Sequence, residues 1–588
     1  MKFILASLLS LAVGSYAVPL QPKDVEIAPR LVQDSVCEHS PTSRRCWGDY
    51  SIFTNYYEVT PPGRPEPVEY WLSAEEGPCA PDGYQRTCMT FNGSLPGPTI
   101  IANWGDLVRV HVTNNMKSNG TSIHWHGVRM LNNVLNDGVP GVTQCPIAPG
   151  QSMTYEFRVT QYGSSWYHSH FSLQYTEGLF GGMIFRGPST ANYDEDLGTV
   201  LLQDWSHIET FNLWAKSVRT GAPARLNGGL INGTNTFNCA GSNDTRCTGQ
   251  GKKFETVFKA GTKYLLRLVN VATDGVFQFS IDGHKLKVIA SDFVAIHPFE
   301  TDSIQLQIGQ RYDVIVEANA APGDYWMRSG WVGKCSFNDN PADMTGIVRY
   351  DAGSKAAPNT TSTVVPSTSC RDEPASKLVP WLELNVTNAP LENLKLSILE
   401  GAKVSSGFFQ WTINSSSLVL DWKNPTMGKI FAKEQIFPTP YNVIEVNRTS
   451  PDPKTPEWAV FVIQDSATTA TLDHPIHLHG HDFWILAQEQ AKWDPSKAAA
   501  FNTVNPPRRD VATLPGGGYL ALAFQLDNPG AWLVHCHIAW HASQGLSLEF
   551  VEDVDMINIA LPGRAEYDEM CKSWDAFTPV WPQEDSGI

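Results

Sequence analysis

Four histidine pairs of the form His-x-His constrain this chain more than any other feature of its sequence. Two pairs lie in the first third of the chain, in HWHG and HSH, and two in the last fifth, in HPIHLHGH and HCHIAWH. These four windows hold 11 of the 16 histidines, which a uniform scatter would not produce. Imidazole is a preferred ligand of copper and zinc. The pattern therefore predicts a metal centre to which both ends of the chain contribute.

The spacing within each pair predicts which side chains work together. Successive side chains of a β-strand point to opposite faces, so the two histidines of a pair share one face. Eight imidazoles, four from each end of the chain, can then converge where two domains meet. They are His124, His126, His168, His170, His477, His479, His535 and His537. Eight neutral imidazoles without a carboxylate favour copper over zinc.

A second group of metal-binding residues remains beside these pairs. His474 has the opposite parity to His477, Cys536 lies on the far face of its strand, and His541 follows five residues later. Two histidines and one cysteine are the ligands of a blue-copper electron-transfer site. Peptide bonds join Cys536 directly to a histidine of the cluster on each side. We therefore expect the single copper to take electrons one at a time, and the cluster to deliver four to dioxygen.

The rest of the chain has the pattern of β-sandwiches or barrels. Short segments with period-two alternation, such as LVRVHVTN, MTYEFRVT and YDVIVEAN, recur between glycine and proline turns. A chain of 588 residues is too long for one ordinary core. We predict three β domains at 34–190, 191–352 and 376–588, with a Ser/Thr/Pro-rich linker at 353–375. Because only the outer two carry His-x-His pairs, the middle domain is expected to be a metal-free copy.

The N-terminus and the charge balance indicate a secreted, extracellular protein. Residues 1–17 have the pattern of a secretory signal peptide, and 18–33 read as a propeptide or N-terminal arm. A buried strand or a membrane anchor is the alternative, although the apolar run is too short to span a bilayer. Eight Asn-x-Ser/Thr sequons fit a glycoprotein. A net charge of -17 argues against nucleic acid and anionic membranes as partners.

Cysteine usage agrees with export. If Cys536 binds metal, ten of the 11 cysteines remain, enough for up to five disulfides in an oxidising compartment. Closely spaced cysteines suggest local pairs, 37 with 46, 79 with 88 and 239 with 247. The sequence alone leaves the connectivity open.

Six motifs of the chain resemble the multicopper oxidases and, within that family, the secreted laccases of ascomycete fungi. They are SIHWHG, DGVPGVTQCPI, SSWYHSHF, HPIHLHGHDF, HCHIAWHASQGL and the terminal DSGI. They cover nearly the whole chain, and the copper motifs occur in the family's order and at similar spacing. The resemblance implies an all-β fold of three sequential cupredoxin-like Greek-key barrels or sandwiches. It also implies four copper ions: one type 1, one type 2 and two type 3.

The same resemblance implies which residues hold each ion. The type 1 copper would take His474, Cys536 and His541, with the non-coordinating Leu546 at its axial position. Loss of an axial donor should raise the reduction potential. The type 2 copper would take His124 and His477. The type 3 ions would take three histidines each: His126, His168 and His537 on one ion, and His170, His479 and His535 on the other.

Two carboxylates are further candidates for catalytic roles. Asp137, in DGVPG, lies where related oxidases place an acid near the trinuclear cluster, and it could relay protons. Asp274, in VNVATDGVFQF, resembles the pocket acid of fungal laccases that accepts the phenolic proton. Both are followed by glycine, and an ordinary Asp-Gly turn is the alternative for each. The Thr-Asp-Gly context of Asp274 also departs from the family's commoner pattern.

The resemblance further implies disulfides and processing. Cys37 would pair with Cys46, Cys145 with Cys571 and Cys335 with Cys370. The mature protein would begin near Asp34. The terminal DSGI would insert into the solvent channel toward the trinuclear site, a frayed terminus being the alternative.

The activity implied is that of a laccase. Small phenols or aromatic amines would lose one electron at a time at the edge of His541. Electrons would pass through Cys536, and the cluster would reduce O2 to water. Lignin fragments, pigment precursors and plant defence phenols stay open as natural substrates, and a monomer is expected.

Three rival functions remain. A ferroxidase would need acids around the type 1 histidines, and none can be assigned from the sequence. Leu546 disfavours an ascorbate oxidase. A copper-binding cupredoxin protein without turnover is the alternative from a different class, and O2 consumption with a simple phenol would separate it from an oxidase.

Overall fold

The computed structural model describes residues 37–117, 119–220, 223–389, 391, 394–403, 409–434, 436–450, 455–468, 471–557, 561–577 and 583–588. The predicted signal peptide at 1–17 and the arm at 18–33 lie outside the described residues. Residues 37–588 form one compact unit. None of the described helices is long and apolar enough to cross a membrane.

The first pair of sheets is formed by residues between Val68 and Arg186. One sheet has the order β4 (Arg86–Phe91), β3 (Val68–Cys79), β6 (Leu107–Asn114), β8 (Ser152–Arg158). The other has the order β5 (Gly97–Asn103), β10 (Phe180–Arg186), β9 (Gly163–Ser169), β7 (Ile123–Trp125). The short strands β1 (Cys46–Trp47) and β2 (Tyr50–Ser51) precede them. Alternating buried residues of β6 and β8 form the core between the sheets, as period-two patterning requires.

The second pair of sheets is formed by residues between Glu195 and Arg349. Its larger sheet has the order β12 (Gly228–Ile231), β11 (Glu195–Trp205), β14 (Lys263–Asn270), β19 (Arg311–Glu317), β16 (Leu286–Ser291), β17 (Val294–Thr301). The other has the order β13 (Glu255–Val257), β21 (Thr345–Arg349), β20 (Asp324–Trp331), β15 (Phe277–Ile281), β18 (Ile304–Leu306).

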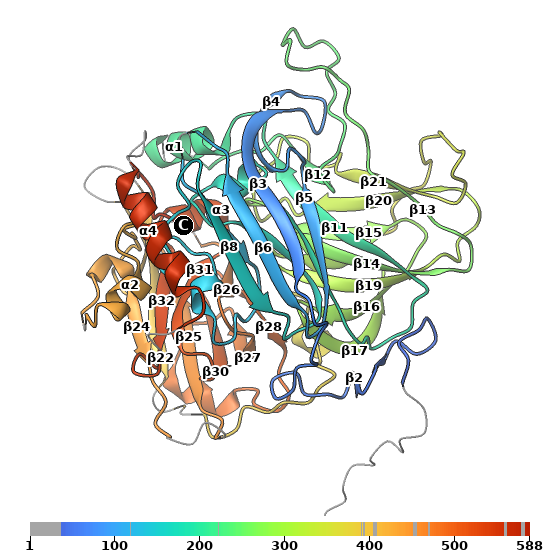
Figure 1. The fold of residues 1–588 in the computed structure, drawn as a ribbon. Helices are drawn as coiled ribbons and strands as arrows, with labels where there is room; N and C mark the ends of the chain where they lie inside the picture. The colour runs from blue at the N-terminus through green and yellow to red at the C-terminus, as the bar shows by residue number, and fades with distance from the viewer. Residues whose placement is uncertain are drawn as a thin grey trace, which may run out of the picture. The chain divides into compact units, whose positions relative to one another are not determined.

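The third pair of sheets begins at Lys395. Its first sheet has the order β23 (Phe409–Ile413), β22 (Lys395–Lys403), β25 (Trp458–Asp465), β30 (Tyr519–Gln525), β27 (Phe483–Glu489), β28 (Arg508–Arg509). Its second has the order β24 (Val443–Val446), β32 (Ser547–Glu552), β31 (Gly530–Cys536), β26 (His474–Leu478), β29 (Val511–Leu514). Figure 1 shows the three pairs in blue to cyan, green to yellow, and orange to red.

The three pairs repeat one topology. Each pair of sheets has one parallel pair of strands in each of its two sheets, at equivalent positions in the strand order. These are β3 with β6 and β5 with β10 in the first, β11 with β14 and β13 with β21 in the second, and β22 with β25 and β24 with β32 in the third. The prediction of an all-β fold is therefore confirmed. The strands β7 and β9 correspond to β15 and β20, and to β26 and β31. In the middle copy, β15 reads FQFSI and carries no histidine.

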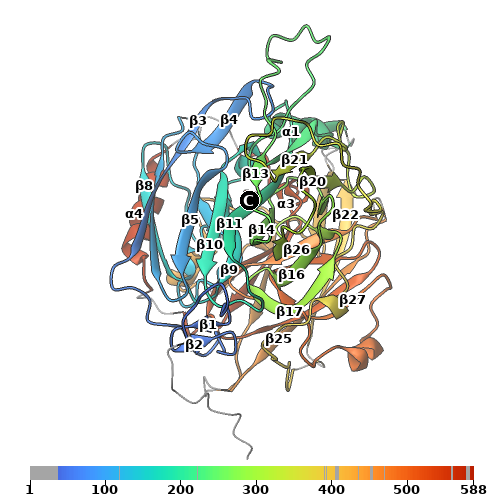
Figure 2. The same cartoon turned by 90° about the vertical axis from the view of Figure 1, so that its right-hand side faces the viewer.

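The described part of the chain has four α-helices, of which α3 is wholly buried. The longer ones are α1 (Thr210–Thr220) and α4 (Arg564–Ala576), and the short ones are α2 (Thr426–Phe431) and α3 (Ala539–Ser543). Figure 2 shows that the chain's C-terminus lies beside α3, as it does in the first view.

The described part of the chain contains five disulfides, and they confirm the predicted pairs. They are Cys37–Cys46, Cys79–Cys88, Cys145–Cys571, Cys239–Cys247 and Cys335–Cys370. Cys145–Cys571 joins the first sandwich to α4 across 426 residues. Cys536 is the free cysteine among the described residues, and it is buried.

Candidate metal centre

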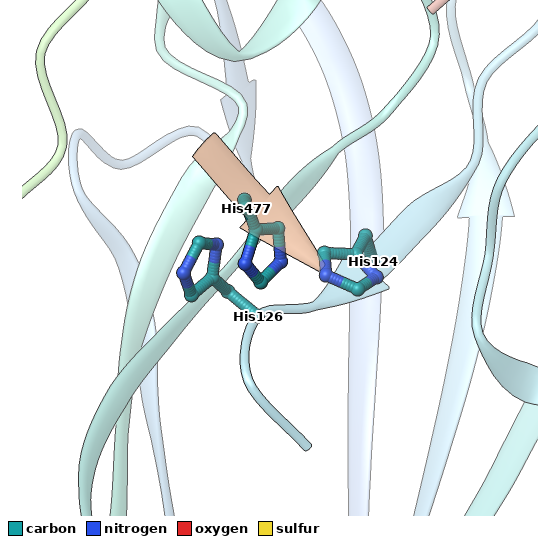
Figure 3. A group of neighbouring side chains, drawn as sticks. All are labelled: His124, His126 and His477. Carbon is teal, nitrogen blue, oxygen red and sulfur yellow. The ribbon is translucent and has the colours of Figure 1, made fainter. Parts of the chain in front are cut away.

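The four histidine pairs lie at the C-terminal ends of strands β7, β9, β26 and β31 in the first and third sandwiches, and the second histidine of each pair directly follows its strand. On β7 and β9, His124 stands opposite His168. On β26 and β31, His477 stands opposite His535. Across the interface, the ring centroids of His124 and His479 are 3.9 Å apart, and those of His126 and His477 are 4.0 Å apart. Figure 3 shows His124 and His126 beside His477, which the other sandwich supplies.

These eight imidazoles form three compact groups within one cluster. The ligand atoms of each group lie within 4.8 Å of one another. The groups are His124, His126 and His477; His126, His168 and His537; and His170, His479 and His535. Each group draws histidines from both sandwiches, so the cluster requires both ends of the chain.

Hydrogen bonds orient five imidazole rings of this cluster so that one nitrogen of each ring is left to bind a metal ion. Five imidazoles donate Nδ1–H to an oxygen at 2.8–3.0 Å and have a buried Nε2 without a hydrogen-bond partner. They are His124, His168, His477, His479 and His535. A buried acceptor without a partner is unfavourable, and a metal ion would satisfy each one. The donor set therefore fits copper.

Asp137 holds two of these rings in place. Its carbonyl accepts from His124 Nδ1 at 2.9 Å, and its Oδ2 accepts from His479 Nδ1 at 2.9 Å. The side chain is fully buried. The next residue, Gly138, has φ +86°, and a Cβ there would lie 1.8 Å from the Ile123 carbonyl oxygen. Asp137 thus belongs to an Asp-Gly turn and also contacts the cluster, so the two interpretations of this residue do not exclude each other.

The structure adds Asp510, a residue that the sequence analysis missed. Its Oδ1 lies 3.1 Å from His126 Nε2, and its carbonyl accepts from His477 Nδ1 at 2.8 Å. Arg311 Nη2 donates to Asp510 Oδ2 at 2.6 Å, and both side chains are fully buried. The motif RRD between two apolar strands is the signal that could have found it, because buried charges are rare unless they are paired.

The second metal-binding group lies on the other face of β31. Cys536 Sγ is 3.7 Å from His474 Nδ1 and 3.5 Å from His541 Nδ1, and the two nitrogens are 3.1 Å apart. Trp411 packs against both rings, at centroid distances of 5.0 and 4.8 Å. His474 is fully buried, whereas 8% of His541 is exposed, so His541 is the histidine of this group that reaches toward solvent.

Leu546 lies beside this group. It is fully buried, and its carbonyl accepts the Cys536 N–H at 3.1 Å. A buried leucine and a buried tryptophan thus lie beside the sulfur and the ring nitrogens of this group.

Burial shifts the pKa of individual residues in both groups. It lowers the pKa of His474 to about 3 and that of His535 to about 4, and it lowers the pKa of His541 well below its usual value. Burial also raises the pKa of the Cys536 thiol. These three imidazoles are therefore neutral and ready to bind metal at neutral pH, whereas the thiol must lose its proton when a metal binds.

Asp274 lies at the edge of the second group. The Thr273 carbonyl accepts from Ala539 N at 3.0 Å, which places the Asp274 loop against α3, the helix that carries His541. The buried Asp204 carboxylate accepts the backbone N–H groups of 273–275 at 2.7–2.8 Å and fixes the loop. Asp274 lines a cavity of about 150 Å³ together with Ile538, and burial raises its pKa to about 7.

The C-terminal tail reaches the cluster. Ile588 is buried and faces a small cavity of about 20 Å³ that His168, His170, His535 and His537 also line. Ser586 N donates to the Ser543 carbonyl at 3.0 Å, and Trp422 Nε1 donates to the Gly587 carbonyl at 3.0 Å. The terminus is thus anchored beside the cluster rather than frayed.

Family models described as multicopper oxidase match residues 73–190, 196–353 and 415–556, which together cover more than half of the chain. The matched ranges correspond to the three sandwiches.

Individual proteins agree with this match. The chain is 54% identical to Laccase-2 of Botryotinia fuckeliana over 96% of this chain and 95% of that protein. It is 50% identical to Laccase-1 of the same organism over 99% of both chains. The crystal structure of a laccase from Botrytis aclada superposes with a TM-score of 0.89 at 54% identity, covering 94% of this chain and 100% of that one. The chain therefore belongs to the multicopper oxidase family, among its ascomycete-type laccases.

Proposed function

We propose that this protein acts as a laccase that binds four copper ions and couples the one-electron oxidation of phenols or aromatic amines to the reduction of O2 to water. The observation that carries the proposal is the arrangement of β31. Cys536 faces the group with His474 and His541, while His535 and His537 face the eight-histidine cluster. The end of β31 and the residue that follows it thus link the two groups through two peptide bonds.

The two metal-binding groups have different proposed roles. Copper bound by His474, Cys536 and His541 would supply a one-electron acceptor, and copper bound by the cluster would supply the site for four-electron reduction of O2. We assign the type 1 copper to His474, Cys536 and His541. The type 2 copper is assigned to His124 and His477, and the two type 3 ions to the remaining cluster histidines. His541, which is more exposed than His474, would receive the electron, and Cys536 is fully buried and so shielded from water. Asp137 and Asp510 orient imidazoles, since both accept hydrogen bonds from ring nitrogens.

An anaerobic titration tests this function. Purified protein should show an intense absorption band in the red part of the spectrum that bleaches with 2,6-dimethoxyphenol when oxygen is excluded. Admission of air should restore the band as O2 is consumed. A protein that is colourless, or one whose band phenols do not bleach, would refute the laccase assignment, and ferrous iron would then be the next reductant to try.

Asp274 is proposed as the group that accepts the phenolic proton. Because its pKa is raised to about 7, the carboxylate form grows as pH rises through 7, and kcat/KM should rise with it. Asp274→Asn should lower kcat/KM by about 100-fold and remove this pH dependence. The exposed Asp302, paired with Lys285, provides the control Asp302→Asn, which should change neither. An unaltered pH profile in Asp274→Asn would assign the proton to another base.

The proposal also covers where the protein acts, its oligomeric state and its substrates. We propose a secreted, extracellular glycoprotein that works as a monomer, supported by five disulfides, which persist in oxidising compartments. The three sandwiches are proposed as its domains. Small phenols and O2 are the proposed partners.

A further inference from the structure

We propose that Glu549 of β32 is a pH switch in the interface between the third and the first sandwich. While its carboxyl is protonated, the short helix α2 stays packed over it. When the carboxyl ionises, α2 and the segment of the first sandwich that α2 contacts loosen beside the copper cluster. The switch acts on the stability of this interface, and it operates whichever substrate the enzyme oxidises.

Glu549 lies on the face of its sheet that carries the cluster histidines. The next residue, Phe550, packs against Phe461 of the other sheet of the third sandwich, and their ring centroids are 5.2 Å apart. Because successive side chains of a strand point to opposite faces, Glu549 points away from that core. Leu533 of β31 stands opposite Glu549, and His535 lies two residues further along β31 on the same face. The carboxyl therefore belongs to the side of the sheet that meets the first sandwich.

The carboxyl of Glu549 is fully buried and lacks a stabilising partner. None of the described residues offers either of its oxygens a hydrogen bond of normal geometry. The hydroxyl of Thr426, at the start of α2, faces the carboxyl but is itself without such a hydrogen bond. An isolated buried carboxylate is far more costly than a neutral carboxyl. Burial accordingly raises the pKa of Glu549 to about 8, and Thr426 opposes this rise only in part.

The titratable side chains of the segments around Glu549 do not supply the missing positive charge. Lys429 of α2 and Arg564 of α4 each pair with a nearby acid, at 3.2 and 2.9 Å. His535 of β31 is neutral, since burial lowers its pKa to about 4. The other titratable side chains are neutral or acidic, and they are Tyr441 of the 3-10 helix η5 (Thr439–Tyr441), Glu445 of β24, Asp137 of the first sandwich and Tyr567 of α4. The neighbouring strand β23 has none.

Helix α2 connects Glu549 to the residues that orient the cluster. This helix packs against β31, and its Thr426 faces the carboxyl. Thr426 N donates to the Gly141 carbonyl at 3.1 Å, and Met427 N donates to the carbonyl of the next residue at 2.9 Å. The segment that they hold begins at Asp137, which accepts hydrogen bonds from two cluster histidines. Because an ionised carboxyl is stabilised by contact with water, ionisation of Glu549 favours release of α2 from this segment.

The protein with α2 in place binds a proton that the protein with α2 released does not bind. The pKa of Glu549 is about 8 with α2 in place, whereas a solvated glutamate has a pKa of about 4.3. Release of α2 therefore gives up a proton between these two values, and each added pH unit favours release about tenfold. Above pH 8 the effect levels off, because the carboxyl is then ionised in both states.

Hydrogen exchange of the copper-loaded protein measures the release of α2. In the wild type, the protection factors of the Thr426 and Met427 amides should fall about tenfold or more between pH 6 and pH 8. Glu549→Gln keeps the shape of the side chain but cannot ionise, so its protection factors should change by less than about twofold. Glu549→Met, with an apolar chain of similar length, should give the same flat profile even if a buried amide impairs folding of the glutamine variant.

The matched control is Glu445→Gln, the same substitution at an exposed position of the neighbouring strand β24. Its protection factors should fall with pH as those of the wild type do. Wild-type protection factors that stay constant from pH 6 to pH 8 would overturn the proposal. An equal fall in the wild type and in the Glu549 variants would overturn it as well, because the titrating group would then be another residue.

Discussion

Replacement of Cys536 by serine is expected to abolish the visible absorption band and to lower phenol oxidation by more than about 100-fold. Loss of a group that merely orients a metal ligand already lowers activity 10–100-fold, and the thiolate is a ligand itself. Serine is nearly isosteric, so the buried site should keep its packing. Because Cys536 points away from the cluster histidines, that cluster should stay intact, and copper content should fall by one ion per chain.

Absorption spectra, copper analysis and O2 uptake with 2,6-dimethoxyphenol measure this outcome. The control is His284→Asn, which alters a buried histidine that lies outside both groups and contacts Tyr350. It should keep the band, the copper content and the activity. A Cys536→Ser protein that stays blue would contradict the assignment of the type 1 site.

Replacement of Arg311 by methionine is expected to destabilise the protein by about 3–5 kcal/mol, because it leaves the buried Asp510 carboxylate without its cation. Arg311 begins β19 of the middle sandwich, whereas Asp510 and His126 belong to the third and the first. The pair therefore joins all three sandwiches at the copper cluster. The unfolding midpoint in guanidinium chloride measures the loss, and copper retention during the titration should fall in parallel.

Two further variants separate the buried charge from simple loss of an ion pair. Arg225→Met breaks an exposed ion pair, in which the side chains of Arg225 and Asp339 are 57% and 43% accessible. This change should alter the free energy of unfolding by less than about 1 kcal/mol. Adding Asp510→Asn to Arg311→Met removes the unpaired charge and should restore part of the lost stability. If the double variant is no more stable than Arg311→Met, the penalty does not come from the buried carboxylate.

Much of the metal centre could be predicted from the sequence because its pattern is local. The period of two in a β-strand is a property of the backbone, so the parity of His535, Cys536 and His537 already separates two groups of ligands. The same period predicted β-sandwiches, and cysteine spacing suggested the local disulfides. The resemblance to ascomycete laccases supplied the long-range pair Cys145–Cys571, which no local pattern contains.

Other features depend on contacts between distant parts of the chain. Asp510 reaches His126 across 384 residues and Arg311 across 199, so their partnership exists only once three sandwiches are packed together. Glu177 of the first sandwich likewise accepts hydrogen bonds from Thr210 at the start of α1. Local periodicity determined the ligand types and the faces on which they lie. Only the tertiary structure decided which buried charges lie against those histidines, because these contacts depend on how separate sheets pack.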